Sequence, residues 1–237
     1  MNDTFGGMFV VDLGSLPVAL IFPAGSFILQ AMAEEKRSFY RKGYTPRKDG
    51  LAEARAWAAG RMWLPRLLLL FYMTWVMFRS LGDPLYQSLF KALNLGIHEL
   101  GHLVTIPLGQ FISIASGSLI QCLAPVAGYF MFRRQGDWFA LGVAAWWLGT
   151  NLHDVAAYAG DARSQSLTLV TPFGGGEIIH DWHYLLSHTG LLEWDHAIAA
   201  VLRLSGFLAM LGGIAWGVVT VVWMIRNEGE NGCKGNS

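Results

Sequence analysis

Long apolar runs, separated by shorter polar stretches, dominate the pattern of this 237-residue chain. The first run, residues 13–33, holds 21 residues without a charged side chain. At about 1.5 Å per helical residue, it is long enough to cross a hydrocarbon core of about 30 Å, although two prolines favour a kink or a re-entrant path. Five later runs are also mainly apolar, although some contain charged residues: 62–78, 86–108, 115–132, 138–158 and 204–225. The pattern predicts an all-α, polytopic membrane helix bundle with about five to six transmembrane helices.

The polar stretches divide the chain into four predicted regions. Residues 34–66 carry nine basic and four acidic side chains, and the positive-inside rule places such a loop in the cytoplasm. The loop follows an N-terminal membrane segment, 1–33, and precedes a membrane catalytic bundle, 67–226, which includes a polar, glycine-rich segment at 162–195. A short tail, 227–237, ends the chain. The predicted location is the bacterial inner (cytoplasmic) membrane, crossed several times.

The composition agrees with a lipid environment and excludes other classes of protein. Hydrophobic residues make up 53% of the chain and charged residues 14%, whereas soluble domains carry about 25% charged residues. The formal net charge is zero, so a nucleic-acid partner is not expected. The two cysteines, Cys122 and Cys233, lie on different segments and form neither a disulfide framework nor a metal-binding pattern. We therefore expect the lipid bilayer, not a polyanion, as the main partner.

One expected membrane helix contains the sequence His98-Glu99-Leu100-Gly101-His102. Residues four apart share a helix face, so the two imidazoles can bind one ion. Zinc binds imidazole at about 2.0–2.1 Å and, in catalytic sites, keeps one position for water. Glu99 would then take a proton from that water as the general base. The structural alternative is a polar patch that bonds to a neighbouring helix, but ionisable residues inside a membrane span usually mark function.

A third zinc ligand has to come from another segment, and an aspartate is expected. Asp161 and Asp154 are seven residues apart and share a helix face. We predict His98, His102 and Asp161 as the metal ligands, with Asp154 and Asp181 as alternatives to Asp161. A second polar cluster, which could bind metal, hold substrate or form an interfacial amphipathic helix, contains Glu177, His180, Asp181 and His183.

The residues 96–104 around the motif, Gly-Ile-His-Glu-Leu-Gly-His-Leu-Val, resemble the site-2 protease family of intramembrane zinc metalloproteases. Residues 108–117 alternate like the short strand that follows the motif helix in that family. The resemblance implies hydrolysis of peptide bonds in membrane proteins, with Asp161 as third ligand by position and Asn151 as a donor to the substrate carbonyl. It covers residues 92–162, and the family's Asn-x-x-Pro and Leu-Asp-Gly signatures are absent from the sequence.

The predicted function is therefore a zinc metallopeptidase that acts on membrane proteins. Two alternatives stay open. The first is a di-iron membrane oxygenase, because His98 and His102, with His180 and His183, are spaced like histidine boxes. The second is a membrane scaffold or regulator whose metal site is structural or degenerate. Metal analysis distinguishes the peptidase, with one zinc per chain, from the oxygenase, with two irons. Glu99→Gln distinguishes the peptidase, which would lose cleavage, from a structural site, which would keep its function.

Overall fold

The computed structural model describes residues 50–167 and 179–234, without the side chains of residues 228–234. They belong to one compact unit that extends over residues 48–237. Within these residues all regular secondary structure is helical, which confirms the predicted all-α class. The predicted membrane segment 13–33 and Glu177 lie outside the described residues. The helices are α2 (Gly50–Trp57), α3 (Leu64–Gly82), α4 (Lys91–Thr105), α5 (Gln110–Gln135), α6 (Trp138–Gly160), α7 (Asp181–Thr189) and α8 (Asp195–Lys234), with short 3-10 turns at Ile106–Leu108 and Leu192–Trp194.

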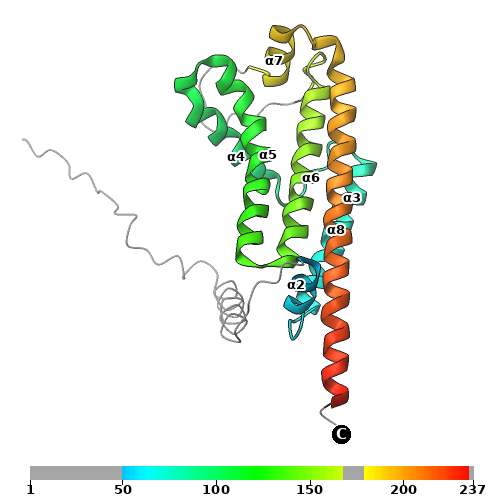
Figure 1. Cartoon of the computed structure of the whole chain (residues 1–237). Helices are drawn as coiled ribbons and strands as arrows, with labels where there is room; N and C mark the ends of the chain where they lie inside the picture. The colour runs from blue at the N-terminus through cyan, green and yellow to red at the C-terminus, as the bar shows by residue number, and fades with distance from the viewer. Residues whose placement is uncertain (1–49, 168–178, 235–237) are drawn as a thin grey trace, which may run out of the picture. The chain divides into compact units, whose positions relative to one another are not determined.

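Helix α6 is the centre of the bundle (Figure 1). It packs against α3, α5 and α8, and none of its 23 residues is exposed. It begins at Asp137, whose side chain accepts a hydrogen bond from Ala140 N at 3.1 Å, as expected of an N-cap. It ends at Gly160, next to the segment that leads to α7. The polar residues of α6 therefore face protein.

Helices α6 and α8 run antiparallel and meet at two pairs of glycines. A Cβ atom on Gly142 would lie 2.6 Å from Gly213 O, and one on Gly149 would lie 2.5 Å from Gly206 O. On each helix the two glycines are seven residues apart, which is two helical turns. Small residues that let two backbones approach this closely are typical of helix pairs in membranes. Any larger side chain at these four positions would separate the helices.

Three helical segments are long and apolar enough to cross a membrane: Leu64–Gly82, Gln110–Gln135 and Leu192–Asn227. This number, counted over the described residues only, is lower than the five to six that the sequence predicts, one of which, 13–33, lies outside the described residues. Helix α4 has only 15 residues, or about 22 Å, which is shorter than the hydrocarbon core. Helix α6 is long enough but carries Asn151, His153 and Asp154 in its second half. The apolar runs around these two helices therefore overestimated the number of spans.

The exposed surface of α3 is apolar along one stripe. Its exposed large side chains recur every three or four residues, so they lie on one face of the helix. An apolar face of this kind suits contact with lipid tails and not with water. The side chains in this stripe are Leu64, Leu68, Phe71, Trp75 and Phe78.

The strand that we predicted at residues 108–117 is wrong. The 3-10 turn ends at Leu108, Gly109 has a positive φ of 95°, and α5 begins at Gln110. The alternation of residue types suggested a strand, but Ser113, Ser116 and Gly117 also recur at helical spacing. These small residues pack against α4, and that contact requires the helix.

Candidate metal centre

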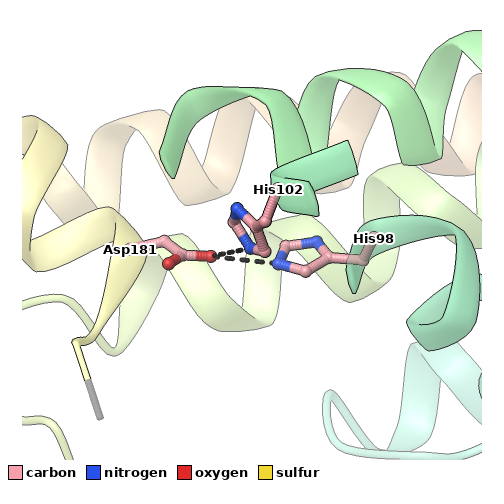
Figure 2. Close-up of side chains that lie close together, drawn as sticks. All are labelled: His98, His102 and Asp181. Carbon is pink, nitrogen blue, oxygen red and sulfur yellow. Dashed lines mark hydrogen bonds and ion pairs between the residues drawn. The ribbon is translucent and has the colours of Figure 1, made fainter. Parts of the chain in front are cut away.

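Two histidines one turn apart on α4 point at an aspartate on α7 (Figure 2). Asp181 Oδ2 lies 3.0 Å from His98 Nε2 and 3.2 Å from His102 Nε2. One ligand atom from each of the three residues lies within 4.8 Å of the others, and this is the only such group in the part of the chain that the structure describes. His98 and Asp181 are buried, and His102 is half-buried. The cluster could hold a metal ion.

The other ring nitrogen of each histidine bonds to α5. His102 Nδ1 lies 2.8 Å from Ser113 O, and a carbonyl oxygen only accepts, so Nδ1 carries the proton. His98 Nδ1 lies 3.0 Å from Gln121 Oε1, and this amide oxygen imposes the same tautomer. Each neutral imidazole therefore directs the lone pair of Nε2 toward Asp181.

With both imidazoles neutral, three electron-pair donors face one another, and a cation between them would satisfy all three. Ligand atoms at about 2.0–2.1 Å from a tetrahedral zinc ion lie about 3.3 Å apart. The distances of 3.0 and 3.2 Å from Asp181 to the two imidazoles are close to that value. Metal-binding histidines typically donate their other N–H to an oxygen acceptor, as both do here. The residues therefore fit a metal ion.

The backbone of α5 lies directly under the two imidazoles. A Cβ atom on Gly117 would lie 2.5 Å from His102 Nε2 and 2.7 Å from His98 Nε2. On the facing side of α4, a Cβ atom on Gly101 would lie 2.6 Å from Ser116 O. Ser116 Oγ also donates a hydrogen bond to Gly101 O at 2.9 Å. Both glycines are required by this close approach, because a methyl group at either position would collide with the opposite helix or with the ligand nitrogens.

Asp181 is fixed as the first residue of α7. Its backbone N–H donates to Tyr158 Oη at 3.1 Å, and His180 caps the helix by accepting from His183 N at 3.2 Å. Burial would raise the pKa of the Asp181 carboxyl, but His102 and His98, when they carry a proton on Nε2, donate hydrogen bonds that hold this pKa below its usual range. At neutral pH the group is therefore an anion that is positioned by α6 and α7 together.

The structure does not bring Asp161, our predicted third ligand, to this cluster. Its carboxylate accepts hydrogen bonds from the hydroxyl groups of Ser164 and Ser166, at 2.5 and 2.7 Å, and from the backbone N–H groups of Ser166 and Leu167, at 2.9 and 3.0 Å. Burial raises the pKa of this carboxyl, but these donors outweigh burial and lower it. The donors use the lone pairs that a metal would need, and Asp181 lies beside the two histidines in place of Asp161.

Asp161 instead holds the beginning of α7. His180 Nε2 lies 3.3 Å from Asp161 Oδ2. Because His180 Nδ1 accepts from His183 N, the proton is on Nε2 and is donated to Asp161. The end of α6 thereby fixes the capping residue next to Asp181. Asp161 is thus connected to the metal cluster only through His180.

The other candidates lie elsewhere. Asp154 pairs with Lys91 Nζ at 3.3 Å and accepts from Asn94 Nδ2 at 3.1 Å, so it joins α6 to the beginning of α4. Asn151 is fully buried in α6, where its Nδ2 donates to Trp147 O and its Oδ1 has no partner among the described residues. Neither contributes a ligand atom to the cluster.

Glu99 is half-buried on α4 between the two histidines in sequence. Its carboxylate interacts electrostatically with His102 and Tyr158. Within the described residues no hydrogen bond or ion pair holds this carboxylate, so it is available to accept a proton. His183, which the sequence left open as a box-like ligand, and the nearby His188 bond through Nδ1 to the backbone carbonyls of Ala162 and Tyr184.

Sequence reasoning missed the residues that orient the ligands: Ser113, Gly117, Gln121 and Tyr158. A signal for three of them exists, because a buried amide and small residues on the helix after the motif recur at positions 113, 117 and 121, one turn apart. Tyr158 had no such signal, since its role depends on where α7 begins.

Comparison of the chain with protein-family models, with curated proteins and with solved structures finds no match. The geometry of this cluster is therefore the main indication of function.

Proposed function

We propose that this protein is an integral membrane metallopeptidase that binds one zinc ion through His98, His102 and Asp181. The observation that carries the proposal is the convergence of two imidazole lone pairs and one carboxylate oxygen, with Glu99 beside them on the same helix. Two imidazoles and a carboxylate are a donor set that catalytic zinc sites use. The resemblance of residues 96–104 to site-2 proteases supports peptide bonds of membrane proteins as the substrate.

The apolar helices support a multi-pass position in the membrane, and the basic segment supports the bacterial inner membrane. Three segments are long and apolar enough to span, and the exposed stripe on α3 suits lipid. In that setting His98 and Asp181 would be costly without a function, because buried ionisable groups are unfavourable in a bilayer. A bound cation would offset that cost.

The chemistry divides between the ion and the chain. A bound zinc ion lowers the pKa of a water ligand to about 7 and polarises a carbonyl group. Glu99 accepts the proton that the water loses as its oxygen forms a bond to the carbonyl carbon of the peptide. Glu99 then returns this proton to the nitrogen of the leaving amine as the C–N bond breaks, which leaves a carboxylic acid and a neutral amine that exchange a proton in solution. Gln121 and Ser113 keep the imidazoles oriented throughout.

One metal ion suits the cluster better than two irons. The described structure gathers only three candidate ligand residues. Three other described histidines are bonded elsewhere, His180 to Asp161, His183 to Ala162 O and His188 to Tyr184 O, and His153 is buried in α6 outside the cluster. A di-iron oxygenase needs many more ligands. This arrangement favours hydrolysis over oxygenation.

The test uses the full chain, purified in detergent and loaded with zinc. It is incubated with membrane proteins of its host, and new peptide termini are identified by mass spectrometry. We expect cleavage inside apolar segments, its loss on chelation and in His98→Ala, and its loss in Glu99→Gln with one zinc retained. Glu193→Gln, which changes an exposed carboxylate that pairs with Arg163, is the matched control and should cleave normally. Normal cleavage by Glu99→Gln would contradict the proposal, and a zinc-bound wild type that cleaves nothing would favour a structural site.

A further inference from the structure

Tyr158 lies between the proposed metal ligands and the capping histidine. It is in the last turn of α6, and its ring centroid lies 4.4 Å from that of His180 and 6.2 Å from that of His98. Its hydroxyl oxygen accepts a hydrogen bond from the backbone N–H of Asp181 at 3.1 Å. These contacts on both sides fix the phenol ring beside the cluster.

The hydroxyl proton of Tyr158 is not used by the fold. A phenol has one proton to donate as well as lone pairs to accept with, and the Asp181 N–H occupies only a lone pair. No described residue accepts the Tyr158 proton, whereas Asp181 and Glu99 both interact electrostatically with the phenol. A neutral donor with a free proton is therefore held beside the ligand carboxylate and the proposed general base.

Peptide hydrolysis at this cluster needs such a donor. When the water oxygen bonds to the carbonyl carbon, the carbon–oxygen double bond becomes a single bond and its electron pair moves to oxygen as negative charge. Glu99 is an anion and repels that charge. Donors that are already in place stabilise it strongly, because they need no reorganisation during the reaction.

We propose that Tyr158 donates its hydroxyl hydrogen bond to the oxyanion of the tetrahedral intermediate. This inference rests on the proposed peptidase function and adds a catalytic residue that the motif does not contain. The proton stays on the phenol, so the proton transfers by Glu99 are the same as described above. Asn151, which the family resemblance suggested for the substrate carbonyl, is fully buried in α6 and is not needed for this role.

Tyr158→Phe tests the inference without a known substrate. The probe is a phosphonamidate dipeptide, whose tetrahedral phosphoryl oxygens imitate the oxyanion, and the reference ligand is acetohydroxamate, which binds metal without a tetrahedral centre. Binding of each to the zinc-loaded full chain in detergent is measured by calorimetry, together with zinc per chain. We expect phosphonamidate affinity to fall about 10- to 100-fold, as for a lost hydrogen bond to a charged group, with acetohydroxamate affinity and zinc content unchanged.

Tyr72→Phe is the matched control. Tyr72 Oη also accepts a backbone N–H, from Leu89 at 3.3 Å, and this hydrogen bond joins α3 to the segment before α4. The two variants therefore lose the same type of hydrogen bond, and only Tyr158→Phe should weaken the phosphonamidate.

The outcomes separate the two proposals. If Tyr158→Phe binds both ligands like the wild type, the role of Tyr158 is wrong while the metal site stands. If zinc and acetohydroxamate affinities fall as much as phosphonamidate affinity, Tyr158 only positions Asp181, and the inference is again overturned. If the wild type binds no zinc, the proposed function itself fails.

Discussion

Asp161 and Asp181 lie at the two ends of the connection between α6 and α7, and both are buried beside histidines. Their partners differ. Asp161 faces proton donors: two hydroxyl groups, two backbone N–H groups and the N–H of His180. Asp181 Oδ2 faces the Nε2 atoms of two imidazoles whose Nδ1 atoms bond to oxygen acceptors on α5. Burial and proximity to histidine therefore do not by themselves identify a metal ligand.

The difference shows that the position of the protons decides which carboxylate can bind a cation. A carboxylate that already accepts several hydrogen bonds has its charge compensated and its lone pairs occupied. A carboxylate opposite two neutral Nε2 atoms has an uncompensated charge and free lone pairs, and a cation would compensate the charge and bind those lone pairs. The two aspartates act in sequence along the chain: Asp161 holds His180, and His180 caps the helix on which Asp181 is the first residue.

Replacing each aspartate in turn should separate the two roles most strongly. Asp181→Ala removes a ligand, so we expect zinc affinity to fall by more than the roughly 100-fold that an outer-shell change can cost. Asp161→Ala loosens only the support of α7 and should cost about 10-fold. Zinc retained against a series of chelators of known affinity measures both. Equal losses, or a larger loss in Asp161→Ala, would return Asp161 to the ligand set.

A methyl group under the imidazoles should also break the site. Gly117→Ala places a Cβ atom within 2.7 Å of both ligand nitrogens, so the rings must move apart. We expect zinc affinity to fall on the order of 100-fold, because overpacking costs about 1–3 kcal/mol and about 1.4 kcal/mol is tenfold. Gly128→Ala on the same helix, where the nearest atom would be 3.9 Å away, should bind like the wild type. Unchanged zinc affinity in Gly117→Ala would show that this close approach does not matter for the metal.

The orientation of His98 by Gln121 predicts a smaller effect. Gln121→Leu leaves the buried Nδ1–H of His98 without an acceptor, and loss of such a partner costs metal affinity about 10-fold or somewhat more. Gln121→Glu keeps an acceptor and should restore most of the zinc affinity. The control variant is Ser164→Ala, which removes one of several donors to Asp161, outside the cluster, and should leave zinc affinity unchanged. If Gln121→Leu binds zinc normally, the assigned tautomer of His98 is not needed.

The smallest effect concerns stability and pH at Asp161. Its pKa is lowered in the folded state, so its ionised form stabilises the fold above the unfolded pKa of about 3.9, and this stabilisation is lost as pH falls toward the lower folded value. Asp161→Asn should lower the melting temperature by a few degrees at pH 7, and the difference from the wild type should shrink below about pH 4. Thermal unfolding in detergent at pH 7, 5 and 3 measures it. A difference that is constant down to pH 3 would contradict this role.

The sequence contained enough to predict the helical class and to pair His98 with His102 as candidate ligands. Apolar runs specify helices, and the spacing of His98 and His102 places both on one face whatever surrounds them. The third ligand was left open among three aspartates because the choice depends on hydrogen bonds made after folding. Asp161 follows α6 directly and shares a face with Asp154, yet Ser164, Ser166 and Leu167 fold back onto it. Nothing in the spacing of these residues indicates that turn.

The number of spans and the strand were mispredicted for a related reason. The apolar run around α6 looked lipid-facing because its polar residues are few, but none of its residues is exposed in the folded bundle. The alternation at 108–117 was compatible with a strand and with a helix, and the contact of Gly101 with Ser116 decides between them. In both cases tertiary packing, and not the local pattern, determined the outcome.

X-ray absorption on the purified full chain tests the central claim most directly. After loading with zinc and removal of excess metal, we predict one zinc per chain, with scattering from two imidazole rings and from oxygen ligands at about 2.0–2.1 Å. His102→Ala should then show at most one imidazole ring. A wild-type protein that retains no zinc, or one whose zinc spectrum is identical in His102→Ala, would contradict the account.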